Sequence, residues 1–262
     1  MRGLLLVAIS LALLAAPARA DERDFCADRP GRGTPACTLA PGDAMLEVGA
    51  VSLDHEADAL SVTDTLTLAD TLARIGVDEK TELQVGLAGY ARALSRDRAS
   101  GDVSRASGFG DSYFAVKRGI DGANGPVAVE AFVTLPSGRA PAGAGDWGAG
   151  VLLPFQHDLP AGFQLALTPE IDAAVNASGH GRHLAVGGVA GLSHGFGKVL
   201  SASAEIAAFQ DQDPAGHALD ARLAGSVAWQ VARKLQLDFE TDLGVTHAAP
   251  TEAFMFGFAA RL

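Results

Sequence analysis

The 262-residue sequence has little cysteine, no excess of basic residues and only one long apolar run, which lies at its start. Beyond that run, no segment reaches the length of a membrane-spanning helix without a charged residue, a Pro or a Gly, so we do not expect helices to carry the chain across a membrane. Lys and Arg number 20 against 31 Asp and Glu. This imbalance argues against nucleic acid as a partner, because phosphate-binding surfaces need clustered basic side chains.

The early apolar run has the features of a secretory signal peptide in residues 1–20. Arg2 precedes the apolar residues 4–9 and 11–14, and the small residues Ala18 and Ala20 lie before the expected cleavage site. Cleavage would leave a mature chain that begins at Asp21, with 18 basic and 31 acidic residues and a formal charge of −13. A retained anchor helix is the alternative, but the run is shorter than the roughly 18 to 20 apolar residues that spanning requires.

Both cysteines, Cys26 and Cys37, lie in the segment 21–42, and the Pro and Gly residues between them allow the chain to double back. In an oxidising compartment this spacing predicts one disulfide, worth about 2 to 3 kcal/mol for so short a loop. A metal site would need more ligands than these two thiols. A free reactive thiol is the remaining alternative.

From Asp43 to Leu262, apolar and polar residues alternate with the period of a β-strand. The odd positions from Val127 to Leu135 and from Leu235 to Val245, for example, are mostly apolar, and charged residues recur between them. The segments are longer than the usual five or six residues of soluble sheets and match strands that cross a bilayer at about 45°. The twelve candidate strands are Ala44–Leu53, Ser61–Ile75, Leu83–Leu94, Phe109–Gly119, Val127–Leu135, Trp147–His157, Phe163–Val175, Leu184–His194, Leu200–Ala208, Leu219–Val231, Leu235–Val245 and Phe254–Leu262.

The connections between these segments alternate between short turns and longer, more polar loops, and aromatic residues lie near strand ends. An even strand count, this alternation and a last strand that can pair with the first predict an all-β fold: an antiparallel, up-and-down, twelve-stranded β-barrel over residues 43–262, in the bacterial outer membrane. The alternative is a secreted sandwich or lipocalin-like barrel with the apolar face inward. Strand length, strand number and the recurring charges favour the membrane barrel.

In such a barrel the polar positions face the lumen, and their charges must be paired or hydrated. Acids outnumber bases, which predicts a lumen that prefers cations or neutral solutes to anions. Alternatively the same network simply fills the barrel, and segment 21–42 either enters the lumen or caps its periplasmic mouth. The predicted lumen-lining residues are Asp70, Arg74, Arg92, Asp111, Lys117, Glu130, Glu170, Asp172, Glu205, Asp220, Arg222, Asp238, Glu240, Asp242 and Arg261.

Motifs that could carry other chemistry are weak, and we expect no cofactor, no metal and no catalytic residues. The G-x-G-x-x-G match at 143–148 precedes a strand rather than a helix, so we interpret it as a loop. His180 and His183 could contribute to a metal site, and 210–217 could bind a hard cation, but neither has a full ligand spacing. A hydrolase would need a nucleophile and a base; the nearest candidate pairs are Ser178 with His180 and Asp213 with His217.

Three segments carry a resemblance to a known family: FCADRPGRGTPACTLAPG, TLPSGRAPAGAGDWGAGVLLP and LTPEIDAAVNASGHGRHLA. The sequence resembles the outer-membrane transporter-like proteins of the MetA-pathway-of-phenol-degradation family over most of residues 21–262. The resemblance implies a barrel for the passage of small, often hydrophobic or aromatic compounds, and it transfers no catalytic residues.

These observations lead to one leading hypothesis and two alternatives. The first is a monomeric outer-membrane barrel, surrounded by lipid, through which small solutes diffuse passively past a charged constriction. The second is a structural or binding barrel with a plugged lumen that conducts nothing. An outer-membrane hydrolase is the third and weakest.

Overall fold

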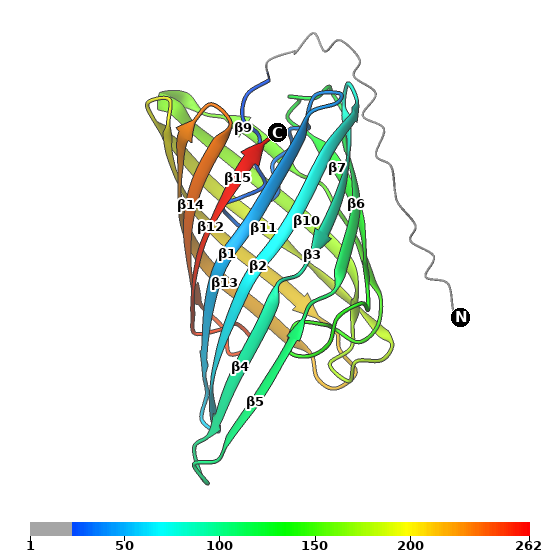
Figure 1. Cartoon of the computed structure of the whole chain (residues 1–262), viewed down its shortest axis with the longest axis vertical. Helices are drawn as coiled ribbons and strands as arrows, with labels where there is room; N and C mark the ends of the chain where they lie inside the picture. The colour runs from blue at the N-terminus through cyan, green and yellow to red at the C-terminus, as the bar shows by residue number, and fades with distance from the viewer. Residues whose placement is uncertain (1–22) are drawn as a thin grey trace, which may run out of the picture.

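The computed structural model describes residues 23–262, a chain built almost wholly of β-strands (Figure 1). The predicted signal peptide and its cleavage site lie outside the described residues. Within them, no helix is long and apolar enough to cross a membrane. The elements are β1 (Ala44–Ala57), β2 (Ser61–Asp78), β3 (Thr81–Leu87), β4 (Tyr90–Asp97), β5 (Val103–Phe109), β6 (Ser112–Gly119), β7 (Ala128–Leu135), β8 (Gly148–Leu152), β9 (Phe155–Asp158), the 3-10 turn η1 (Pro160–Gly162), β10 (Phe163–Val175), β11 (Arg182–Phe196), β12 (Leu200–Asp211), β13 (Ala218–Ala232), β14 (Leu235–Gly244) and β15 (Glu252–Arg261).

The strands form a closed antiparallel barrel with twelve crossings, as the alternation predicts. Three crossings are each made of two strand segments: β3 with β4, β5 with β6, and β8 with β9. β3 and β4 both pair with β2. β6 pairs with β3 and β5 pairs with β4, while β8 and β9 both pair with β10. The first and last strands, β1 and β15, pair over Met45–His55 and so close the barrel. Closure leaves no open edge around the barrel wall, which a bilayer requires.

Large apolar side chains point outward, and charged ones point inward. Val151, Ile171, Leu223 and Phe256 are exposed, whereas buried charged residues include Arg74, Lys117 and Glu82. A soluble barrel would show the reverse arrangement, with an apolar interior and a charged outer surface. The outer surface therefore suits lipid and the inner surface suits water and ion pairs.

A line of backbone irregularities crosses the first four crossings of the barrel. The β1 ladder with β15 shifts between Gly49 and Val51, Ala69 of β2 has a φ of 58°, and breaks at 88–89 and 110–111 separate β3 from β4 and β5 from β6. At one break, a Cβ on Gly89 would lie 2.2 Å from the carbonyl oxygen of Leu68, so only glycine fits there. Each irregularity reverses which side chains face outward beyond it.

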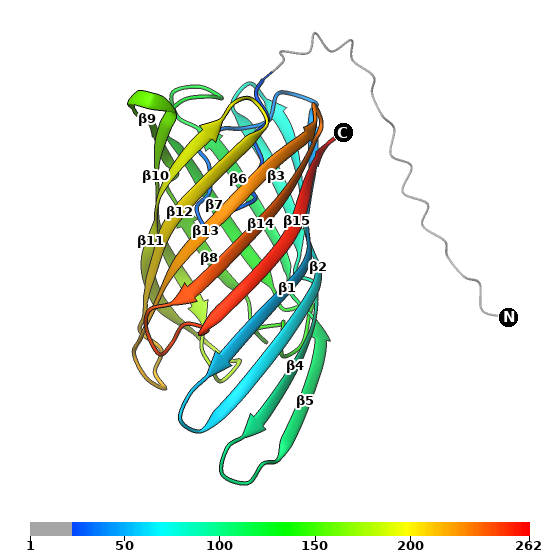
Figure 2. The same ribbon diagram turned by 90° about the vertical axis from the view of Figure 1, so that its left-hand side faces the viewer.

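The two ends of the barrel differ. The start of the described chain, the C-terminus and the short turns lie at one end, and longer loops lie at the other (Figures 1 and 2). In bacterial outer-membrane barrels, the end with the short turns faces the periplasm. Beyond the line of irregularities, the far parts of β1, β2, β4 and β5 extend past the rest of the wall at the loop end (Figure 2). We call this four-stranded extension, residues 51–57, 61–68, 90–97 and 103–109, the arm.

Candidate functional site

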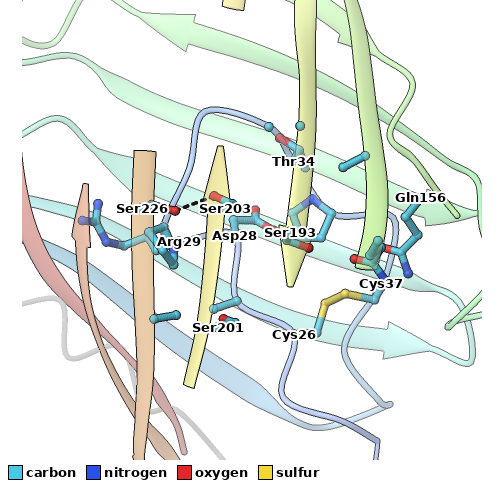
Figure 3. A pocket seen from close by; sticks show the side chains of 18 of the residues that line it. Cys26, Asp28, Arg29, Thr34, Cys37, Gln156, Ser193, Ser201, Ser203 and Ser226 are labelled. Carbon is cyan, nitrogen blue, oxygen red and sulfur yellow. Dashed lines mark hydrogen bonds between the residues drawn. A yellow bond between two sulfur atoms is a disulfide. The ribbon is translucent and has the colours of Figure 1, made fainter. Parts of the chain in front are cut away.

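The N-terminal segment 23–42, which we call the plug, lies inside the barrel rather than capping it. Its two legs are joined by the Cys26–Cys37 disulfide, which confirms the predicted pairing (Figure 3). Between the cysteines the chain contacts strands that are not neighbours in the wall. The N–H of Gly31 donates to Glu240 Oε2 on β14 (2.8 Å), and that of Thr34 donates to Thr168 Oγ1 on β10 (3.2 Å).

Two plug arginines pair with carboxylates of β14. Arg29 Nη2 lies 2.8 Å from Asp238 Oδ1, and Arg32 Nε lies 2.8 Å from Asp242 Oδ2. Both carboxylates are almost fully buried. A buried carboxylate needs a cation or several donors, so the acid-rich face of β14 provides a specific docking surface for the plug.

A second set of ion pairs joins the plug to another part of the wall, on the other side of β15 from β14. Arg74 of β2 contacts Asp28 of the plug at 3.0 Å, Glu47 of β1 at 2.8 Å and Glu82 of β3 at 2.8 Å. Lys117 of β6 lies 2.9 Å from the same Asp28 oxygen. All of these wall side chains are buried, and Arg74 and Lys117 also face Glu47, Glu82 and Glu130 of the wall, so the plug aspartate joins a wall network that already contains both charges.

The plug separates two cavities within the barrel. The larger, about 570 Å³, lies toward the termini, and the smaller, about 260 Å³, lies toward the loop end. Asp28, Arg29, Gly33 and Thr34 line both, so only the plug stands between them. Any solute that crosses the barrel by this route must pass or displace the plug.

The larger cavity is lined mainly by neutral polar side chains from the wall. Ser203 and Ser226 share a 2.6 Å hydrogen bond, and Ser193, Ser201 and Gln156 lie nearby (Figure 3). Such groups offer hydrogen bonds without imposing a charge on the solute. The sequence-based site consists of charged residues alone and misses this set, although Ser201, Ser203 and Ser226 occupy the same polar face.

Fourteen of the fifteen predicted lumen residues lie on the inner face or at its mouth. Asp220 and Arg222 pair with each other, Arg261 binds Asp43 at the periplasmic mouth, and Asp111 accepts hydrogen bonds from the amides of Gly138 and Ala144 in a loop. Asp70 is exposed and lines the smaller cavity. The others are buried or half-buried within the barrel: Arg74, Lys117, Glu130, Glu170, Asp172, Glu205, Asp238, Glu240 and Asp242.

Arg92 is the exception, and its placement corrects the prediction. Directly paired residues of neighbouring strands share one face of a sheet. Arg92 of β4 pairs with Leu66 of β2, and Leu66 pairs with Leu53 of β1. Leu53 in turn pairs with Phe254 of β15, which is exposed on the outside of the barrel. Arg92 therefore lies on the outer face. The prediction assumes unbroken alternation, whereas the irregularities at Ala69 and at 88–89 reverse it.

The structure also places residues that the sequence reasoning does not select. Asp28, Arg29 and Arg32 of the plug, and Glu47 and Glu82 of the wall, carry most of the contacts between the two. Charge near the cysteines is visible in the sequence, but its partners lie up to 210 residues away. No local pattern identifies contacts at that separation.

The other candidate motifs lie in the loops and adjoining strand ends opposite the C-terminus. His183 contacts Asp211 at 3.2 Å and Asp213 at 3.4 Å, and no group of three or more metal-ligand residues is found within residues 23–262. The Ser178 hydroxyl donates to the backbone carbonyl of His180 rather than to its ring. Backbone N–H groups of Ala177 and Ala215 donate to Asp213 and hold the pKa of its carboxyl below the ordinary value.

Solved structures with a similar fold are bacterial outer-membrane proteins. The COG4313 outer membrane channel of Pseudomonas putida F1 aligns with a TM-score of 0.65 at 12% identity, over 89% of this chain and 99% of that one. The β domain of the Bordetella autotransporter BrkA gives 0.55 at 12%, over 85% and 100%. The CymD monoaromatic hydrocarbon channel gives 0.50 at 10%, over 86% and 89%. At such identities the likeness shows the fold.

Comparison with family sequences is more specific. No curated protein sequence matches the chain, but residues 27–262 match the family described as "Putative MetA-pathway of phenol degradation". The match covers the plug from the residue after Cys26 onward and the whole barrel. The chain therefore belongs to this family.

Proposed function

We propose that the protein is a monomeric outer-membrane channel through which small solutes diffuse, with the plug as its constriction. The observation that carries the proposal is the pair of cavities, about 570 and 260 Å³, separated only by the plug inside a closed barrel. Passive diffusion needs a continuous path and no catalytic group. We also propose cleavage of the signal peptide after Ala20, which would free the plug to fold into the lumen.

The charges of the lumen support selection against anions. Within residues 23–262, Glu170, Glu205 and Glu240 make no ion pair with a basic side chain, whereas Arg74 and Lys117 are each shared by several acids. A narrow, acid-lined path attracts cations and repels anions. Neutral solutes would pass without this bias.

The solute class that we propose is small uncharged compounds with a hydroxyl group on an apolar or aromatic body. The neutral serines and glutamines of the larger cavity can hydrogen-bond a hydroxyl, and alanines and Phe25 line the same cavity. The family description and the monoaromatic hydrocarbon channel among similar structures point toward the same class of solute.

A second candidate function is a non-conducting barrel that remains plugged. The ion pairs of Arg29, Arg32 and Asp28 with buried wall residues favour it, because together they hold the plug at both sides of the lumen. Recordings on the mature chain, residues 21–262, in planar bilayers distinguish the two. The channel proposal expects discrete conductance steps, with a reversal potential that indicates cation preference in a KCl gradient, and uptake of phenol into proteoliposomes.

Two results would contradict the channel. Absence of conductance and phenol uptake both in the mature chain and in a variant lacking residues 23–40 would leave the structural barrel as the function. A clear preference for anions would contradict the proposal that the acid-lined lumen selects against anions, although the protein would still be a channel.

A further inference from the structure

The outer face of the arm carries a row of arginines above apolar residues. Beyond the aromatic pair Tyr90 and Phe109, whose rings lie 5.2 Å apart, the outward positions of β4 and β5 include Arg92, Arg96 and Arg105. Neighbouring outward positions on β1 and β2 are Val51, Leu53, Leu66 and Leu68. Along the strands the three arginines thus follow these apolar positions, and the outward Val62, Leu94 and Val103 lie among them.

The register places the three arginines close enough to share one ligand. Arg92 and Arg96 lie four residues apart on β4, about 13 Å, and Arg105 lies on β5 opposite Leu94, about 8 Å from each. All three are exposed, and none makes a hydrogen bond or an ion pair with its side chain within residues 23–262. An acid on the same face, Asp64, contacts His55 Nδ1 at 2.7 Å and makes no ion pair with any of the three arginines.

The height of the cluster on the barrel indicates what it meets. Aromatic side chains collect where the hydrocarbon of a bilayer gives way to head groups, and Tyr90 and Phe109 lie one step below Arg92 on the loop side of the barrel. The arginines therefore lie at the level of the head groups of the outer leaflet. Acids outnumber bases in this chain, so three unpaired arginines in one place are not explained by a need for net charge. Arginine binds phosphate groups strongly, and the head groups of this leaflet are a source of phosphate.

We propose that Arg92, Arg96 and Arg105 bind the phosphate groups of lipopolysaccharide in the outer leaflet, with Leu53, Leu66 and Leu68 against its acyl chains. This inference rests on the proposed location in the outer membrane and on the loop end facing outward. A lipid head group, rather than free phosphate, fits because the apolar rows continue directly below the basic cluster.

The test measures binding of purified bis-phosphorylated lipid A to the detergent-solubilised mature chain, by native mass spectrometry and by co-purification. The R92Q/R96Q/R105Q variant should bind at least tenfold more weakly, and R92K/R96K/R105K should bind more strongly than the glutamine variant, because lysine keeps the positive charge although it loses the bidentate geometry. The matched control K80Q/K198Q/K234Q removes three charges from the periplasmic end and should bind as the unmodified chain does. Dephosphorylated lipid A should bind to the unmodified chain as weakly as bis-phosphorylated lipid A binds to the glutamine variant. Millimolar inorganic phosphate should not displace lipid A from the unmodified chain.

Equal binding of lipid A by the glutamine variant and the unmodified chain would overturn the proposal. So would equal binding of dephosphorylated lipid A, or binding of an anionic polymer such as heparin without binding of lipid A. Loss of heat-modifiable gel mobility in a variant would reveal misfolding, and the comparison of phosphorylated with dephosphorylated lipid A on the unmodified chain then decides. The conductance measurement tests the channel proposal independently of lipid binding. In bilayers that lack lipopolysaccharide, the glutamine variant should conduct as the unmodified chain does.

Discussion

Replacing Arg29 with alanine tests whether ion pairs hold the plug in the lumen. The guanidinium of Arg29 donates to Asp238 Oδ1 through Nη2 at 2.8 Å and through Nε at 3.2 Å. The Asp238 side chain is fully buried. In the alanine variant this carboxylate would keep its burial and lose its cation whenever the plug is docked.

The cost of that loss sets the size of the effect. Removing one partner of a buried ion pair costs about 3 to 5 kcal/mol, and each 1.4 kcal/mol is about a factor of ten in an equilibrium. Arg29 lines the larger cavity and is 21% exposed, so hydration reduces the cost toward the lower value. We therefore expect the ratio of undocked to docked plug to rise by roughly a hundredfold.

The assay is single-channel recording in planar bilayers. Arg29→Ala should show frequent, long openings that approach the conductance of the variant lacking residues 23–40. The double variant Arg29→Ala/Asp238→Asn should open less often than Arg29→Ala, because the docked plug no longer leaves a buried carboxylate without its cation. Heat-modifiable gel mobility would verify that each barrel is assembled.

Two outcomes would refute this reasoning. If Arg29→Ala records like the unmodified chain while the deletion variant conducts more, the ion pair is not what docks the plug. If the deletion variant also records like the unmodified chain, the plug is not the barrier.

Three further predictions follow from the same structure. Leu223→Lys on the lipid face should destabilise the barrel by about 2 to 4 kcal/mol in urea unfolding from lipid vesicles, whereas Ser203→Lys in the larger cavity should assemble normally and reduce cation preference. Reduction of the Cys26–Cys37 disulfide should increase current noise, because the two plug legs are no longer joined; unchanged noise would show that the ion pairs alone order the plug. Backbone N–H donors of Gly181 and Trp147 lower the pKa of Asp146, so its loop contacts are present above the ordinary value of 3.8 and are lost as pH falls through the lowered pKa; pepsin should cleave the adjoining loop only below pH 3.8, but at higher pH in Asp146→Asn.

Strand alternation predicts the barrel because most of the wall follows it without interruption. From β10 to β15, inward and outward positions alternate over 10 to 15 residues per strand, and the ladder shifts only near one strand end. Burial of one face then fixes the register. For the same reason, alternation alone is enough to place Asp238, Glu240 and Asp242 together on the inner face of β14.

The first four crossings show where that logic ends. A residue with positive φ, such as Ala69, has no clear signature in its sequence, yet it reverses the faces of everything beyond it. Unbroken alternation places Arg92 inside because it anticipates neither the irregularity at Ala69 nor the break at 88–89 between β3 and β4. The reversal also creates the arm, whose outward arginines would face the lumen in a regular barrel.

The plug is the other feature beyond the reach of the sequence. The spacing of Cys26 and Cys37 is enough to predict their disulfide, since both ends of the loop are local. Docking depends instead on pairs such as Arg32 with Asp242, which join the plug to the penultimate strand. Such pairs are set by three-dimensional complementarity, for which a single sequence carries no periodic signal.

The acid surplus of the lumen and the basic residues of the plug are two parts of one arrangement. Arg29 and Arg32 neutralise Asp238 and Asp242 while the plug is docked, and Gly31 and Arg32 donate backbone N–H groups to Glu240 and Glu205. Undocking removes these cations and donors together and exposes four carboxylates to the path. Cation preference should therefore be stronger in the open channel than in the plugged one, and the reversal potential of the variant lacking residues 23–40 should lie further toward the cation limit than that of the mature chain.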